Sequence, residues 1–130
     1  MLYVVSTPIG NLKDFSFRAL DVLQECDYIL CEDTRHSQTL LNHYSIKKPL
    51  KSFHRFNERM RLENILDDLI TGKDIALISD AGTPAISDPG LQLISKCRQK
   101  KIPMTTIPGA CALIVALLLS GFSSTVFQFL

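Results

Sequence analysis

The stretch with the clearest chemical character runs from Ile75 to Gly90 and has the sequence I-A-L-I-S-D-A-G-T-P-A-I-S-D-P-G. Its first five residues predict a buried strand, and the loop that follows mixes carboxylates with residues that shape the backbone. Gly82 can adopt a positive φ, whereas Pro84 fixes φ and lacks an N–H. Asp88 and Pro89 are typical of a helix cap and first turn. Ligands of open α/β sheets bind at such loops, outside the carboxyl ends of the strands.

Two further polar clusters follow earlier apolar runs. The segment E-D-T-R places Glu32, Asp33 and Arg35 directly after one run. Asp33 or Thr34 could cap the next helix while Arg35 is solvated, or the group could hydrogen-bond a ribose or another polar substrate. The second cluster follows the next run and contains His54, Arg55, Asn57 and Glu58. His54 could have either a structural or a functional role.

Several site chemistries lack their sequence signatures. The chain has neither G-x-x-x-x-G-K-[ST] nor G-x-G-x-x-G, which argues against a P-loop nucleotide or a nicotinamide cofactor. An aspartyl-phosphate nucleophile at Asp80 would need a second acidic residue two positions later, but that position is Gly82, which argues against this chemistry. The three His and four Cys fit no metal template, so we expect no metal. His36 and His43 are expected at the surface, and the cysteines are expected to be reduced thiols, mostly in the core.

Composition predicts an ordinary globular domain. The 130 residues are 46% hydrophobic with a formal net charge of +1, so any grip on nucleic acid would need a local basic patch or another part of the protein. No signal peptide is visible, and the longest apolar run, residues 110–119, is about half of what spans a bilayer. We therefore expect a cytoplasmic protein without membrane contact.

Apolar runs and helical periodicity alternate along the chain at short intervals. Strands are predicted at 2–5, 28–31, 50–53, 75–79 and 103–107, with a sixth at 126–130. Helices are predicted from Asp14 or Ser16, from the E-D-T-R segment to about Tyr44, across 62–70 with a stop at Gly72, across 88–99, and, buried on all sides, across 110–119. This βαβ alternation predicts an α/β fold with a mostly parallel five-stranded sheet and helices on both faces. Four loops would then share one sheet edge, at 7–11, 32–35, 80–89 and 108–111, and three of them combine Pro with Gly.

Five blocks resemble a known family in order and spacing. They are Y-V-V-S-T-P-I-G-N-L (3–12), E-D-T-R (32–35), H-R-F-N-E (54–58), S-D-A-G-T-P-A-I-S-D-P-G (79–90) and I-P-G-A-C-A-L-I (107–114). They are similar to the bacterial small-subunit ribosomal RNA 2′-O-ribose cytidine methyltransferases, within the tetrapyrrole methylase superfamily. The resemblance spans the whole chain, but the family is about twice as long. It therefore indicates an N-terminal domain over 1–122, with 123–130 leading into a second domain.

The resemblance implies S-adenosylmethionine as methyl donor, bound in a cleft between two α/β domains of a homodimer. Carried onto this sequence, the cofactor contacts fall at Pro8, Ile9, Asp80, Ala81, Gly82, Thr83, Pro108, Gly109, Ala110 and Cys111. Substrate contacts fall at Asn11, His54, Asn57 and Glu58. Relatives tend to have P-G-P-S or P-G-A-S in the last block, so Cys111 would make a weaker side-chain hydrogen bond than Ser, while a backbone contact is unaffected.

The implied reaction methylates the 2′-hydroxyl of a cytidine in the small ribosomal subunit. A hydroxyl is a poor nucleophile, so its proton has to be removed during or before attack. Glu32 or Asp33 could orient the ribose or take the proton, and Arg35 could hold a phosphate. Two alternatives remain open: a methylase of the same superfamily that acts on a small tetrapyrrole, and a module that binds the cofactor without turnover.

Overall fold

Five short strands form one parallel sheet in the computed structural model, which describes residues 1–130. The strands are β1 (Leu2–Val5), β2 (Tyr28–Cys31), β3 (Leu50–Ser52), β4 (Ile75–Leu77) and β5 (Met104–Ile107). Their order in the sheet is β3-β2-β4-β1-β5, and every pair is parallel. β1 therefore lies inside the sheet, with Leu2 opposite both Ile75 and Met104. The predicted five-stranded α/β architecture is confirmed.

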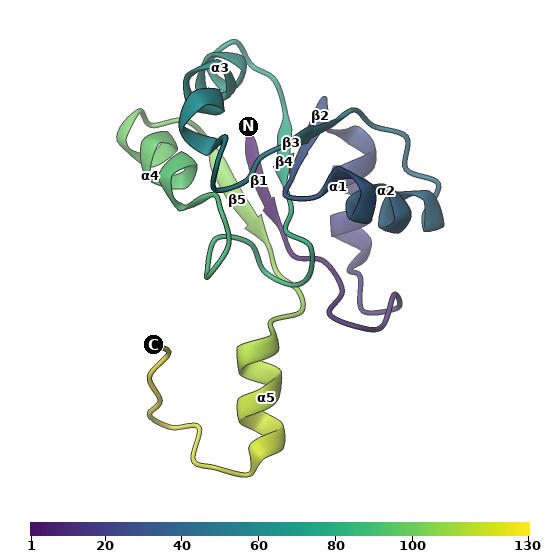
Figure 1. The fold of residues 1–130 in the computed structure, drawn as a ribbon, viewed down its shortest axis with the longest axis vertical. Coiled ribbons are helices and arrows are strands. Elements are labelled where there is room, and N and C mark those ends of the chain that lie inside the picture. The colour runs from purple at the N-terminus through teal and green to yellow at the C-terminus, as the bar shows by residue number, and fades with distance from the viewer.

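Four helices cover the sheet, two on each face (Figure 1). They are α1 (Phe17–Glu25), α2 (Thr34–His43), α3 (Glu58–Ile70) and α4 (Leu91–Gln99). Leu30 and Leu77 pack in one core cluster with α3 and α4, whereas Ile29 and Ala76 pack in the other with α1 and α2. Neighbouring residues of a strand point to opposite faces, so a sheet covered on both sides needs apolar residues at every position.

Side-chain caps fix the starts of the first two helices as the sequence predicts. The Ser16 hydroxyl accepts a hydrogen bond from the Ala19 amide at 3.1 Å. The Asp33 carboxylate accepts from the Arg35 and His36 amides at 2.9 and 3.3 Å. Both residues have extended backbone angles and satisfy amides that lack a partner within the helix.

The predicted start of α4 is wrong. The helix begins at Leu91 rather than Asp88, and Gly90 is its N-terminal cap residue with φ of 125°. A Cβ at Gly90 would lie 2.6 Å from the Leu77 Cδ2 atom, so the loop needs glycine at this close approach to β4. As a result Asp88 lies in the loop rather than capping the helix.

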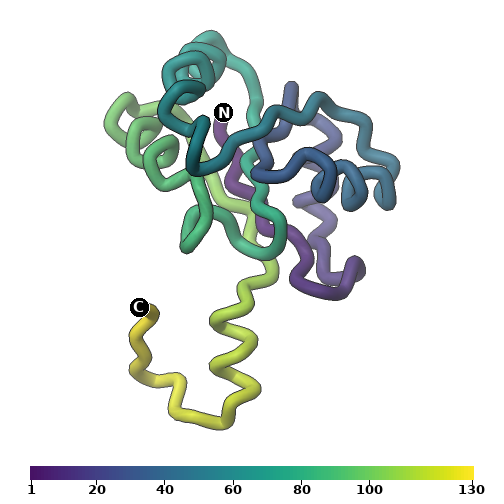
Figure 2. The backbone as a smooth tube through the Cα atoms, in the orientation of Figure 1, coloured from purple at the N-terminus to yellow at the C-terminus, as the bar shows by residue number.

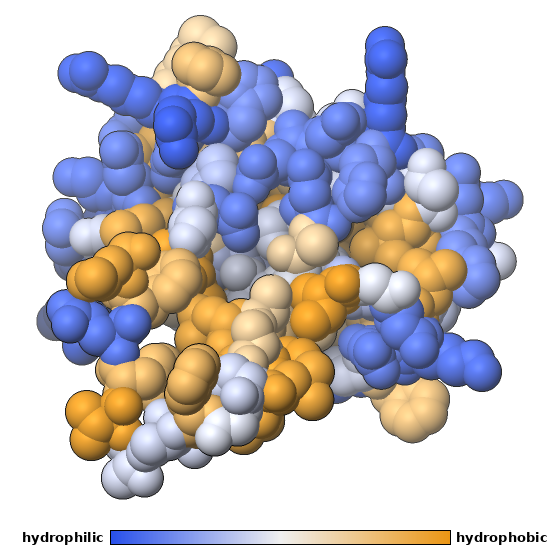
Figure 3. All heavy atoms as spheres, turned by 60° about the horizontal axis from the view of Figure 1, so that its bottom comes forward, coloured by the Kyte–Doolittle hydropathy of each residue, from blue (hydrophilic) through white to orange (hydrophobic).

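The end of the chain departs most from the sequence-based expectations. The last helix, α5, spans Ala112–Ser120 rather than 110–119, and none of its residues is buried. No strand forms over 126–130, where every residue is exposed. In Figures 1 and 2, α5 stands away from the sheet and its helix layers, and Figure 3 shows apolar side chains gathered on this part of the molecule. The run is apolar as predicted, but this chain provides no surface to bury it and no strand to pair with residues 126–130.

The strand ends differ from the prediction by one or two residues, and the cysteines are reduced as predicted. β3 and β4 end one and two residues earlier than predicted, although Phe53 and Ile78 beyond them stay buried. All four cysteines are free thiols, and three are buried. Burial raises the pKa of the Cys26 thiol to about 11, so it stays protonated at neutral pH. No helix in the structure has both the length and the apolar character needed to cross a membrane.

Candidate functional site

Hydrogen bonds join the loops that follow β1, β4 and β5 at the carboxyl edge of the sheet. Thr7 and Gly82 exchange two backbone bonds, at 3.0 and 3.1 Å, as an isolated antiparallel bridge. The Thr83 hydroxyl lies 3.0 Å from the Ser6 hydroxyl and donates to the Ala110 carbonyl at 2.9 Å. Three segments of the predicted cofactor site, far apart in sequence, therefore meet through main-chain and hydroxyl groups.

Two glycines allow these loops to approach closely. Gly82 has φ of 80°, and a Cβ there would lie 3.1 Å from the Ile9 Cγ2 atom and 3.5 Å from the Ala110 carbonyl oxygen. A Cβ at Gly109 would lie 2.8 Å from the Ser6 Cβ atom. Larger residues would push the β1 loop away from the other two.

A small cavity of about 200 Å³, called the central cavity below, opens between these loops and α5. Its lining includes five of the predicted cofactor residues: Ile9, Ala81, Gly82, Thr83 and Cys111. Its apolar walls, together with the polar side chains of Thr83, Ser87 and Asp88, suit a ligand with both apolar and polar groups. Binding sites for small molecules usually occupy roughly 300–1,000 Å³, so this cavity is part of a site rather than a whole one.

The remaining predicted cofactor residues lie around the central cavity. Pro8 and Asp80 line a neighbouring cavity together with the predicted substrate residue Asn11. Pro108 and Gly109 form the exposed turn that leads into Ala110. The structure thus gathers all ten predicted residues at one edge of the sheet.

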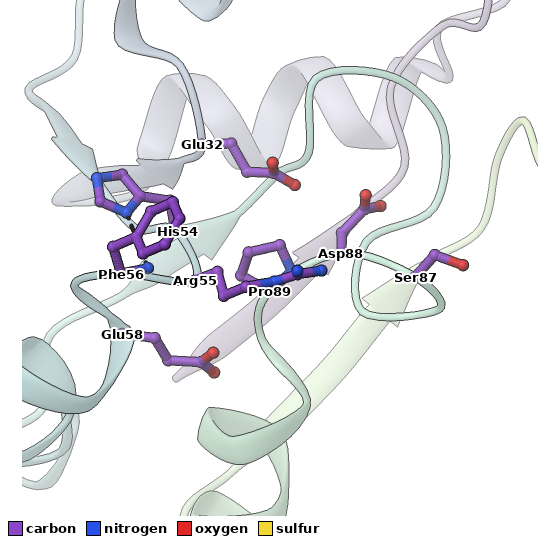
Figure 4. Close-up of a pocket in the computed structure, with 8 residues that line it drawn as sticks. All are labelled: Glu32, His54, Arg55, Phe56, Glu58, Ser87, Asp88 and Pro89. Carbon is purple, nitrogen blue, oxygen red and sulfur yellow. Dashed lines mark hydrogen bonds between the residues drawn. The ribbon is translucent and has the colours of Figure 1, made fainter.

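A second cavity of about 370 Å³, called the acidic cavity below, lies on the other side of the 80–89 loop. It is lined by Glu32, His54, Arg55, Phe56, Glu58, Ser87, Asp88 and Pro89 (Figure 4). The side chains of Glu32, Arg55 and Asp88 converge on its centre in Figure 4. Ser87 and Asp88 also line the central cavity, so the two cavities share a wall.

Glu32 has the most perturbed environment in this cavity. Burial raises the pKa of its carboxyl above the ordinary value, and the negative charges of Asp88 and Asp80 raise it further, whereas Arg55 opposes them. A carboxylate with a raised pKa binds a proton more strongly and is better matched to general-base work near neutral pH.

The residues of the E-D-T-R segment have different roles: one caps a helix, one is exposed and one lines a cavity. The Asp33 carboxylate is engaged with the first amides of α2, which matches the capping alternative. The Asp33 amide donates to an Asp80 carboxylate oxygen at 3.4 Å. Arg35 is exposed and lines neither cavity. Glu32 alone of the three faces a cavity beside the cofactor loops.

The residues of the H-R-F-N-E segment also have different roles: some stabilise the fold through hydrogen bonds, and His54 borders a cavity. Asn57 is buried; its carbonyl oxygen accepts from the His54 amide at 2.8 Å and its amide group donates to the Ser52 carbonyl at 3.2 Å. Asn57 therefore stabilises the turn before α3. His54 borders the acidic cavity, where its ring nitrogens lie 3.2 Å from the Phe56 amide and 3.1 Å from the Asn57 side chain. Glu58 accepts from the Gly90 amide at 3.2 Å and so ties α3 to the start of α4.

The contact made by His36 was not predicted from the sequence. Its Nε2 atom lies 2.8 Å from the Asp80 carbonyl oxygen and connects α2 to the loop after β4. His36 and His43 are exposed as predicted, but their separation of seven residues places them on one face of α2. That spacing was the available signal. Asp88 was also missed as a cavity residue, because D-P before a helix is typical of a cap.

A family model described as tetrapyrrole (corrin/porphyrin) methylases matches residues 1–129. The chain belongs to the tetrapyrrole methylase family. Two solved structures named as methylases share the fold, and both are under 25% identical to this chain. A uroporphyrin-III C-methyltransferase from Thermus thermophilus has a TM-score of 0.68 and 22% identity, covering 96% of this chain and 53% of that one. A cobalt precorrin-4 methyltransferase has a TM-score of 0.70 and 19% identity, covering 96% and 52%.

Closer relatives of this tetrapyrrole methylase domain carry the name "Ribosomal RNA small subunit methyltransferase I". The protein of that name from Pasteurella multocida is 52% identical over 129 residues, which is 99% of this chain and 46% of the relative. The one from Haemophilus influenzae is 51% identical over 129 residues, again 99% of this chain and 46% of the relative. The one from Mesomycoplasma conjunctivae is 56% identical over 94% of this chain and 52% of the relative. The chain spans about half the length of the curated relatives it matches.

Proposed function

We propose that this chain is the cofactor-binding part of an S-adenosylmethionine-dependent methyltransferase that modifies a cytidine 2′-hydroxyl in small-subunit ribosomal RNA. The observation that carries the proposal is the shared wall between the central cavity and the acidic cavity. A methyl donor and a hydroxyl acceptor have to meet in line, and holding them so is the main task of such an enzyme. Identity of about 50% to relatives named for ribosomal RNA supports RNA over a tetrapyrrole as the acceptor.

The central cavity would hold the cofactor. Ile9 and Thr83 would contact it from two loops, and the close approach at Gly82 and Gly109 would bring backbone groups to it. When bound, the cofactor supplies a methyl group already activated on a sulfonium. At about 200 Å³ this cavity needs a second wall, which we assign to a domain that follows residues 123–130 in the whole protein. We infer a homodimer for that whole protein from the resemblance.

Glu32 is the group best placed to accept the hydroxyl proton. Asp33 was the alternative, but its carboxylate already accepts two amide hydrogen bonds of α2. Glu32 is half-buried and its carboxyl has a raised pKa. It lies in the acidic cavity beside Asp88, and Asp88 belongs to the wall that this cavity shares with the central cavity. Arg55 would neutralise the phosphate beside the acceptor ribose, the role given to Arg35 from sequence. His54 would contact the nucleotide from the rim.

Calorimetric titration of the whole protein, and of variants of it, with S-adenosylhomocysteine tests the cofactor site. Replacing Ile86, which is exposed and lines the central cavity, by Trp should fill the cavity and weaken binding at least tenfold. Ile70→Trp, at an exposed position at the end of α3, is the matched control and should bind as the unchanged chain does. Equal affinity of both variants would contradict the assigned site.

The acceptor is tested with the whole protein of which this chain is a part. Incubation with labelled S-adenosylmethionine and unmethylated small ribosomal subunits should label one cytidine on its ribose 2′-oxygen. Label on a tetrapyrrole but not on RNA would support the small-molecule alternative. Cofactor binding without transfer to either acceptor would support a binding module and contradict the proposed activity.

A further inference from the structure

The largest cavity of the molecule, about 650 Å³, has no assigned role in the mechanism above, although the predicted cofactor residues Pro8 and Asp80 and the predicted substrate residue Asn11 line it. One wall is a stripe of α2 formed by His36, Thr39, Leu40 and His43, which are spaced as i, i+3, i+4 and i+7. The opposite wall is the β1 loop over residues 8–12, and Asp80 and Ala81 complete the lining. We call it the α2 cavity. This stripe is distinct from the positions of α2 buried against the sheet, Ser37 and Leu41.

Hydrogen bonds hold both walls of the α2 cavity in place. The Tyr44 hydroxyl donates to the Leu12 carbonyl and ties the tip of the β1 loop to the end of α2. Tyr44 also packs edge-on against the buried Phe15, with ring centroids 5.3 Å apart. At the other end, His36 contacts the Asp80 carbonyl. The cavity is therefore a preformed part of the fold.

The lining combines apolar surface with a few polar groups. Ile9 and Leu12 on the loop and Leu40 on α2 offer apolar surface from two sides, as a flat ring requires. Asn11 and Asn42 use their carbonyl oxygens in local hydrogen bonds, to the Lys13 amide and the Gln38 side chain. Their amide NH₂ groups donate to nothing in the structure and are free to meet ring acceptors.

Asp80 adds an acceptor to these two donors. A carboxylate accepts from an exocyclic amine, as acidic side chains do from the N4 group of cytosine. Two donors and one anionic acceptor match the edge of an unpaired cytosine, which offers two acceptors and an amine. Uracil has a carbonyl oxygen in place of that amine and would face the Asp80 carboxylate unfavourably.

We propose that the α2 cavity binds an unstacked, amino-bearing nucleobase of the RNA substrate. The inference rests on the proposed function, since it takes RNA as the acceptor. It adds a base-recognition site on α2 and the β1 loop, separate from the acidic cavity that receives the ribose. RNA-binding proteins recognise sequence in this way, by splaying bases out of single-stranded regions and reading their edges. The other source of such a ring is the adenine of the cofactor, but adenine presents only one acceptor beside its amine on its Watson–Crick edge and would leave one of the two asparagine donors unmatched.

Nuclear magnetic resonance titrations of the ¹⁵N-labelled whole protein, in which the second wall of the cofactor cavity is present, test this site. Millimolar cytidine should shift the amides of Asn11, Thr39 and His43, while uridine should give at least tenfold weaker saturation. S-adenosylhomocysteine should instead shift Thr83 and Cys111. Shifts of the α2 amides by S-adenosylhomocysteine would assign the cavity to adenine and overturn the proposal.

Asn42→Leu removes one proposed donor at an exposed helix position and should weaken cytidine binding at least tenfold. Gln38→Leu is the matched control, because it breaks the same Gln38–Asn42 hydrogen bond without changing the cavity lining. Both variants should keep the response to S-adenosylhomocysteine. A chain that binds S-adenosylhomocysteine but shows no cytidine shift on α2 overturns this inference and leaves the proposed function standing. Cytidine shifts on α2 without any S-adenosylhomocysteine binding support the base site and contradict the cofactor assignment alone.

Discussion

At the scale of single residues, Glu32 shows how position rather than residue type selects a candidate base. Glu32 and Asp33 are adjacent and both carry a carboxylate, but Asp33 faces the amides of α2 and Glu32 faces Asp88. Hydrogen bonds from amides stabilise a carboxylate in its charged form, whereas burial and like charges destabilise it. Glu32 is therefore the better-placed proton acceptor, because its carboxylate is not occupied by the helix amides and its pKa is raised.

Replacing Glu32 by Gln in the whole protein should lower the rate of methyl transfer by about 10²–10⁴-fold, the usual contribution of a general base. Titration with S-adenosylhomocysteine should give an unchanged affinity, because Glu32 does not line the central cavity. In the unchanged protein the rate should fall as the pH drops through the raised pKa of Glu32, above the ordinary value of 4.5. Glu63→Gln, at an exposed position on α3, should be without effect.

Glu32→Gln should slow methyl transfer but should stabilise the fold. A carboxyl whose folded pKa is raised destabilises the fold at a pH above that pKa, where the charged form has to be maintained. Glu32→Gln should thus raise the Tm at pH 7, and the gain should shrink as the pH falls through the raised pKa toward 4.5. A Tm difference that is constant across this range in calorimetry would contradict the assigned environment.

Gly90 allows a test of close approach against backbone strain. Gly90→Ala introduces both a positive-φ penalty and a contact 2.6 Å from Leu77, and should destabilise the fold by roughly 2–5 kcal/mol. Gly72 also has a positive φ, 99°, but its Cβ would meet nothing within 4 Å. Gly72→Ala should therefore cost only roughly 1–2 kcal/mol in chemical denaturation. Equal losses would mean that Leu77 moves aside.

At the scale of secondary-structure elements, the start of α2 depends on Asp33. Asp33→Ala should lose roughly 0.5–2 kcal/mol of stability, whereas Asp33→Asn should lose much less because Asn also caps well. If Asp33 only positions α2, the Asn variant should keep nearly full methyl transfer. A rate loss in Asp33→Asn as large as that in Glu32→Gln would restore Asp33 as a candidate base.

Most elements could be predicted because their signals are local. The three interior strands, β1, β2 and β4, are apolar runs, and Ser16 and Asp33 stand at caps where their side chains are expected. The start of α4 could not be predicted, because the reason for Gly90 is the side chain of Leu77, thirteen residues away. The strand order, which places β1 between β4 and β5, is likewise absent from any local pattern.

The candidate site was predictable in part for the same reason. Residues that follow parallel strands were expected to meet, and Ile9, Thr83 and Cys111 do so. The pairing of Glu32 with Asp88 was not, because it depends on the path of the 80–89 loop. The α2 cavity also depends on contacts between segments, through Tyr44 and Leu12.

At the scale of the whole molecule, the exposed apolar surface of α5 is the feature most prone to cause self-association of this chain. Leu118, Leu119 and Phe122 are 66%, 83% and 80% exposed, and monomeric proteins rarely leave a continuous patch of this kind uncovered. The isolated chain should therefore self-associate in a concentration-dependent way in analytical ultracentrifugation and bind a hydrophobic dye. Leu118→Lys combined with Leu119→Glu should reduce both effects.

Ile70→Glu provides the control for that experiment. Ile70 is 61% exposed at the end of α3, away from α5, so its replacement should leave self-association unchanged. An equal reduction in both variants would mean that a polar replacement at any exposed apolar position, rather than the loss of the α5 surface, governs association.

The position of β1 inside the sheet also has a consequence for folding. β2 and β3 are close in sequence and can pair early, but Leu2 has to wait for partners 73 and 102 residues downstream, at Ile75 and Met104. Contacts between residues so far apart slow folding, because a long loop has to close before they form. During synthesis at about 5–20 residues per second, β1 would stay without its partners β4 and β5 for several seconds. The apolar residues of β1 therefore remain exposed in the growing chain until the residues of β4 and β5 have been made.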